Sequence, residues 1–147
     1  MKIIDEKQKF DLQIVGYENP NSVEKDDGNW LIVQVFVFLL AQGSWSAKRS
    51  CLRTFELVEL RNWFQMLMNG MTNDSSIGFT ENELAFRYEK TGVLSIVLDF
   101  YFHPSGDKYD YEQDEEIVLN YRLEEINLNE IVDSLNNYIS IYGEKKF

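Results

Sequence analysis

The chain has 147 residues, 44% of them hydrophobic and 27% charged, as is usual for a folded globular protein. A chain of this length is expected to form one domain, residues 1–147, whose core needs no disulfide or metal. The 25 acidic and 14 basic residues give a formal net charge of −11. This charge argues against binding to nucleic acid or to an anionic membrane and favours a basic protein partner. The alternative that the acidic charge serves only solubility stays open.

The N-terminal residues lack the apolar stretch of a signal peptide. The longest apolar run, residues 31–41, is interrupted by Gln34 and is too short to span a bilayer. Cys51 is the only cysteine, so no intrachain disulfide can form. This is consistent with a protein that works in a reducing compartment. We therefore expect a cytoplasmic protein.

Seven segments have strand-like hydrophobic patterns, most of them alternating apolar and polar residues. They are residues 10–14, 30–41, 45–50, 77–80, 84–88, 94–102 and 117–123. The segment 30–41 is almost wholly apolar, which predicts a central strand buried on both faces, with Trp30, Phe36 and Phe38 in the core.

Two segments have helical periodicity. The first starts near Thr54, the expected N-cap, and ends at Asn69-Gly70. The second starts at the expected N-cap Asn127, with Glu130 at the third helical position, and ends at Gly143. Lys145 and Lys146 are expected near the negative end of its dipole.

These elements predict an α+β fold with the order βββαββββα. The short turns between strands favour a mostly antiparallel sheet of about seven strands, with the two helices on one face.

The sequence contains no recognisable catalytic motif. His103 is the only histidine and precedes a turn, so it is interpreted as a structural residue at a strand end. Cys51 lies among apolar residues and is interpreted as a partly buried structural cysteine. A hydrolase that uses only carboxylates stays open as an alternative, because 25 acidic residues include some close pairs. The prediction is a non-enzymatic protein with no catalytic residues.

No cofactor or metal site is predicted either. The glycines are isolated and form no phosphate-binding loop. Asp110, Glu112 and Asp114 alternate as calcium ligands do in an EF-hand, but Glu115 replaces the required glycine and Tyr121 the bidentate glutamate.

The strongest candidate for a binding site is the acidic loop, residues 107–116. It contains six acidic residues, one lysine and two tyrosines. Carboxylates can pair with Arg or Lys of a partner, and tyrosines supply rigid contact area. The predicted partner-binding residues are Asp107, Tyr109, Asp110, Tyr111, Glu112, Asp114, Glu115 and Glu116. A solvated hairpin loop is the alternative, and a second acidic segment with Glu24, Asp26 and Asp27 would widen the surface if it lies nearby.

Several short segments, spread over residues 28–125, resemble the WapI family of bacterial immunity proteins. They are Asn29-Trp30-Leu31, Gly43-Ser44-Trp45, Leu52 with Thr54-Phe55-Glu56-Leu57, Leu60 with Trp63, and Leu84-Ala85-Phe86. The resemblance implies an antidote that binds the C-terminal domain of a cell-surface toxin, a tRNA-cleaving nuclease, and protects the producing cell. It implies no catalytic residues. The alternative is a housekeeping or regulatory interaction module, such as a homodimer formed through exposed aromatic sheet surface.

Overall fold

The computed structural model describes residues 1–145 and consists of eight strands and three α-helices in that range. The strands are β1 (Lys2–Ile4), β2 (Gln8–Tyr17), β3 (Trp30–Leu39), β4 (Gly43–Arg53), β5 (Ser75–Gly78), β6 (Leu84–Glu89), β7 (Val93–Leu98) and β8 (Ile117–Arg122). The helices are α1 (Lys25–Gly28), α2 (Thr54–Met68) and α3 (Leu128–Ile141), with 3-10 turns η1 (Phe100–Phe102), η2 (Gly106–Lys108) and η3 (Leu123–Glu125).

The strands form two antiparallel sheets of four, in the orders β1-β2-β3-β4 and β5-β6-β7-β8. The inward side chains of both sheets meet in one apolar core, where the Phe10 ring of β2 lies edge-on to the Phe86 ring of β6, 6.1 Å away. The predicted α+β class and antiparallel pairing are confirmed. The difference is that the strands are divided between two sheets, with the short strand β1 added at one edge.

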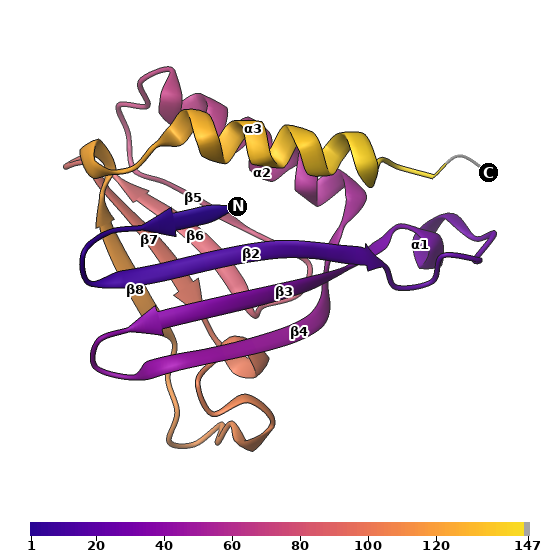
Figure 1. Cartoon of the computed structure of the whole chain (residues 1–147), viewed down its shortest axis with the longest axis horizontal. Coiled ribbons are helices and arrows are strands. Elements are labelled where there is room, and N and C mark those ends of the chain that lie inside the picture. Colours follow the sequence, from indigo (N-terminus) through magenta and orange to yellow (C-terminus); the bar gives the residue numbers. More distant parts are fainter. Residues whose placement is uncertain (146–147) are drawn as a thin grey trace.

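Helices α2 and α3 lie side by side across one end of the two sheets (Figure 1). Their apolar stripes face the core, where Leu60, Phe64 and Leu135 are fully buried. The predicted cap of α3 is present, since Asn127 Oδ1 accepts a hydrogen bond from the Glu130 amide at 3.2 Å. Helix α2 begins one residue earlier than predicted: Arg53 is its N-cap, and its amide donates to the buried carboxylate of Glu56. The local capping signals therefore fix both helix starts to within a residue.

Polar side chains connect the two sheets at their edges. The Tyr121 hydroxyl of β8 donates to the Ile3 carbonyl of β1 at 3.0 Å. The Trp45 indole of β4 donates to the Phe102 carbonyl of η1 at 2.9 Å. These bonds place β1 next to β8, and β4 next to the segment that leads into the acidic loop.

Two predictions about strands were wrong in detail. Strand β7 ends at Leu98 and not at residue 102, because the Asp99 carboxylate accepts a hydrogen bond from the Phe100 amide and starts the turn η1. Strand β3 is central but is not buried on both faces: Phe36 is 41% exposed. Its outer face has no second layer, since the helices cover the end of the sandwich and not this face (Figure 1).

Near the C-terminus, the Lys145 ammonium group donates hydrogen bonds to the carbonyls of Asn19 and Pro20. Lys145 thus ties the end of the described chain to the loop after β2. Lys146 lies outside the described residues. Within residues 1–145, no helix has the length and apolar character that crossing a bilayer would require.

Candidate partner-binding loop

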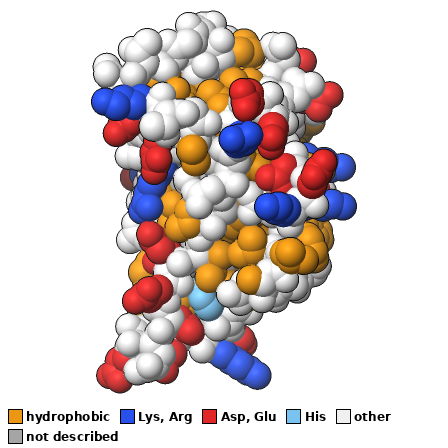
Figure 2. Space-filling model, turned by 90° about the vertical axis from the view of Figure 1, so that its left-hand side faces the viewer, with side chains coloured by type: hydrophobic (Ala, Val, Ile, Leu, Met, Phe, Trp, Pro, Cys, Tyr) orange, Lys and Arg blue, Asp and Glu red, His pale blue; other side chains and the backbone are white. Residues whose placement is uncertain are grey.

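The acidic loop projects from the sandwich beyond the sheet end opposite the helices (Figure 1). It connects η1 to β8 and contains the turn η2 and a tight turn in which the Gln113 and Asp114 amides donate to the Asp110 carbonyl. Figure 2 shows a projection carrying acidic side chains at this end of the molecule, with apolar side chains gathered above it. The loop is therefore accessible to another molecule.

Tyr109 holds the loop to the body of the protein. Its hydroxyl donates to Asp99 Oδ1 at 2.6 Å and lies 3.1 Å from the Asp114 carbonyl. The hydrogen bond to the Asp99 carboxylate raises the pKa of Tyr109 to about 12, because it favours the protonated phenol. Tyr109 was predicted as a partner contact, and the structure gives it a role in positioning the loop.

Three aromatic rings pack against one another at the base of the loop, in tilted and edge-on arrangements. The Tyr109 and Tyr111 rings are 5.3 Å apart, and both contact Phe100, at 5.4 and 5.8 Å. Phe100 has a positive φ of 49°, the only such non-glycine residue in the described range, a backbone conformation that costs energy unless the surroundings enforce it. Tyr111 is 79% exposed. It combines a supported ring with a free face, as an interface anchor does.

The carboxylates of the loop fall into two groups. The first group stabilises the loop itself and consists of Asp110, Asp114 and Glu116. Asp114 Oδ2 accepts from the Asp110 amide at 2.8 Å, Asp110 Oδ1 accepts from the Glu112 amide at 2.9 Å, and Glu116 pairs with Arg87 of β6 at 3.4 Å.

Asp107, Glu112 and Glu115 are exposed and form no salt bridge within the described residues. They are the carboxylates most available to a partner's Arg or Lys. Across residues 1–145, no group of three or more His, Cys, Asp or Glu side chains is arranged to hold a metal ion.

The second acidic segment does not widen this surface. It forms α1 and its flanks, at a different end of the molecule from the acidic loop (Figure 1). Asp26 pairs there with Arg53 at 3.7 Å, and Asp27 accepts a hydrogen bond from Asn19 at 2.9 Å. The two acidic segments are therefore separate.

The surroundings of His103 and Cys51 are those of structural residues. His103 is buried at the end of η1, where its Nδ1 accepts a hydrogen bond from the Ser105 amide at 3.0 Å. Cys51 is fully buried in β4, and burial raises the pKa of its thiol well above the usual value. A buried, protonated thiol is a poor nucleophile.

The outer face of sheet β1-β2-β3-β4 is an exposed surface that the sequence analysis assigned to the core. It displays Phe36 and Ile4, 41% and 47% exposed, beside Lys2 and Lys9. The signal that could have revealed it is Gln34. It lies two residues before Phe36 in β3, so the two side chains share one face of the sheet. A polar residue at that position indicates a solvated face.

The fold and the loop together define a small α+β protein with an acidic and aromatic loop that projects from its surface. The chain belongs to the immunity protein WapI-like family, whose model matches residues 2–143, nearly its whole length. The resemblance noted from short sequence segments is thereby confirmed. Neither a curated protein nor a solved structure matches the chain.

Proposed function

We propose that the chain is an immunity protein that binds a cognate toxin domain in the cytoplasm and blocks it without catalysis. The observation that carries this proposal is the family match over residues 2–143. The proposed toxin is a nuclease. Its surface should be basic, because enzymes that act on nucleic acid bind phosphates with Lys and Arg.

The acidic loop supports this choice of partner. It carries a net charge of −5, from six acidic residues and one lysine, within ten residues. The exposed carboxylates would pair with the basic residues of the toxin, and Tyr111 would supply an apolar anchor among them. The loop is held in place before binding by Tyr109, which lowers the entropy cost of ordering it.

The proposal is tested by co-expressing the chain with the toxin domain encoded by the neighbouring gene. Growth should be rescued and the two proteins should co-purify. Without both results the proposed function is wrong.

Charge reversal tests the role of the loop. Glu112→Lys combined with Glu115→Lys should weaken binding to the purified toxin domain by about tenfold or more. The matched control is Glu24→Lys combined with Glu59→Lys, which makes the same charge change at exposed positions outside the loop. If both pairs weaken binding equally, only total charge matters and the loop is not the docking site.

A second candidate function is an interaction module that forms a homodimer. The observation in its favour is the outer face of sheet β1-β2-β3-β4 with Phe36 and Ile4 exposed. Light scattering should then give twice the monomer mass, and Phe36→Lys should restore the monomer. A monomeric wild-type mass would rule out this dimer.

A further inference from the structure

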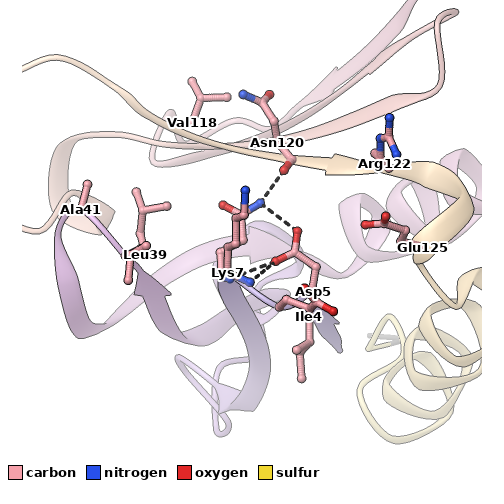
Figure 3. Close-up of a pocket in the computed structure, with 12 residues that line it drawn as sticks. Ile4, Asp5, Lys7, Leu39, Ala41, Val118, Asn120, Arg122 and Glu125 are labelled. Atoms are coloured by element: carbon pink, nitrogen blue, oxygen red, sulfur yellow. Dashed lines mark hydrogen bonds between the residues drawn. The ribbon is translucent and has the colours of Figure 1, made fainter.

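A groove separates the free edge of β8 from the turns at the ends of the β1–β2 and β3–β4 hairpins. We call it the edge groove. Its volume is about 1210 Å³, larger than most small-molecule pockets. Figure 3 shows Val118, Asn120 and Arg122 of β8 along one side, with Leu39, Ala41 and Ile4 across from them. The groove is open to solvent and borders residues 118, 120 and 122 of β8.

The hydrogen-bond pattern of β8 shows that its backbone faces this groove. The Leu123 amide donates to the Gly92 carbonyl at 2.9 Å, and Gly92 and Leu123 continue the register in which Val93 is opposite Arg122. In an antiparallel ladder, hydrogen-bonded pairs alternate with pairs whose backbone groups point outward. Residues 118, 120 and 122 therefore direct their N–H and C=O groups away from β7.

An independent contact supports this orientation. The Asn120 carbonyl accepts a hydrogen bond from the side-chain amide of Gln8, which reaches across from β2. The Gln8 amide occupies the position that a backbone N–H of a neighbouring strand would take. Among residues 1–145, no backbone partner is found for the Val118, Asn120 and Arg122 amides.

The far wall of the groove can receive side chains. Ile4 is 47% and Leu40 is 75% exposed, and Leu39 lies beside them. An extended segment in the groove could direct alternate side chains onto these apolar residues while its backbone pairs with β8. The groove also begins close to the proposed docking loop along the chain, since Val118 lines it and β8 begins at Ile117 immediately after Glu116.

We propose that the edge groove accepts an extended segment of the toxin domain, which displaces the Gln8 side chain from the Asn120 carbonyl and pairs with β8 as a fifth strand of its sheet. This inference rests on the proposed function and adds to it the structural element of the partner. The acidic loop and the edge groove then form one continuous interface, the loop recognising charge and the groove recognising backbone.

Amide hydrogen exchange, measured by NMR on the free chain and on its complex with the toxin domain, tests the proposal. In the free chain the amides of Val118, Asn120 and Arg122 should exchange fast and those of Leu119 and Tyr121 slowly. In the complex the three fast amides should become protected by about tenfold or more. Fast exchange of these amides in a formed complex would overturn the inference and leave the proposed function intact.

A pair of variants at one position separates the backbone from the side chain. Val118→Pro removes the outward N–H without removing a ladder hydrogen bond, as is tolerated in an edge strand. It should weaken binding by about tenfold. Val118→Thr keeps the N–H and the β-branched shape at a partly exposed position and should bind within about twofold of the wild type.

Equal affinities of a folded Val118→Pro and of Val118→Thr would contradict pairing at this position. If Val118→Pro does not fold, the exchange measurement on the wild-type complex decides. Failure of the toxin domain to bind the wild-type chain at all would overturn the proposed function, and this inference with it.

Discussion

Tyr109 is the residue that connects the candidate site to the fold. Its hydroxyl bonds to Asp99, which also accepts from the Phe100 amide and so holds the unusual backbone conformation there. Tyr109→Phe keeps the ring and removes the hydroxyl. We expect the free energy of unfolding to fall, because the Asp99 carboxylate loses a donor. Toxin binding should weaken by about threefold or more, because the loop is less well ordered.

Urea denaturation and calorimetric titration measure these two effects. Tyr88→Phe is the matched control, since Tyr88 lies in β6 outside the acidic loop and its hydroxyl has no hydrogen-bond partner in the described residues. A Tyr109→Phe variant that matches this control in both measurements would show that the hydroxyl does not position the loop.

Glu83 is a buried carboxylate whose ionisation opposes folding. It is only 5% exposed and pairs with Arg49 at 3.1 Å. Burial nevertheless raises its pKa above the usual 4.5. Between the unfolded and the raised folded pKa the native state binds more protons than the unfolded state, so the contribution of Glu83 to stability falls as pH rises.

Glu83→Gln should remove this pH dependence. The difference in unfolding free energy, variant minus wild type, should become more favourable to the variant between about pH 4.5 and about pH 7. Denaturant titrations of both proteins at the two pH values give the difference directly. A constant difference, or one of opposite sign, would show that the ion pair with Arg49 outweighs burial.

At the scale of elements, the helices could be predicted better than the strand ends. The Asn127 cap depends on residues three positions apart, so it is visible in the sequence. The end of β7 depends on Asp99, whose carboxylate is held by Tyr109 ten residues away. Alternating apolar residues continue to position 102, so the pattern alone could not show that the strand stops at Leu98.

The cap of α3 gives a quantitative prediction. Asn127→Ala removes the side-chain acceptor for the Glu130 amide and should lower the free energy of unfolding by about 1 kcal/mol. Asn127→Asp retains an acceptor at the helix N-terminus and should be close to wild type. Thermal unfolding followed by circular dichroism compares the three proteins. An Asn127→Ala variant as stable as the wild type would mean that the cap contributes nothing.

At the scale of the whole molecule, composition and periodicity predicted the α+β class but not the division into two sheets. Strand partners are set by contacts distant in sequence, such as Tyr121 with Ile3, which no local pattern reveals. The acidic loop was identified from its residues alone. Its division into supporting and free carboxylates required the structure, because Glu116 pairs with Arg87 of β6. The edge groove was not predicted, since it depends on which strand is at the edge.

The distribution of charge makes a prediction about the rate of toxin binding. Nearly half of the net charge of −11 belongs to the projecting acidic loop. Such a charged projection should speed the encounter with a basic toxin domain through long-range attraction. Because the Debye length shortens from about 30 Å at 0.01 M salt to about 8 Å at 0.15 M, the association rate constant should fall by about tenfold over that range. The dissociation rate constant should change much less, because the contacts at the interface are short-ranged.

Stopped-flow measurements on the wild type and on Glu112→Lys combined with Glu115→Lys separate loop charge from total charge. The variant should show a smaller salt dependence than the Glu24→Lys and Glu59→Lys control, although both have the same net charge. If the two have the same dependence, attraction comes from the whole molecule, and the loop acts only after contact. The Val118→Pro variant should keep the wild-type association rate and dissociate faster, since backbone pairing in the edge groove forms after the charged encounter.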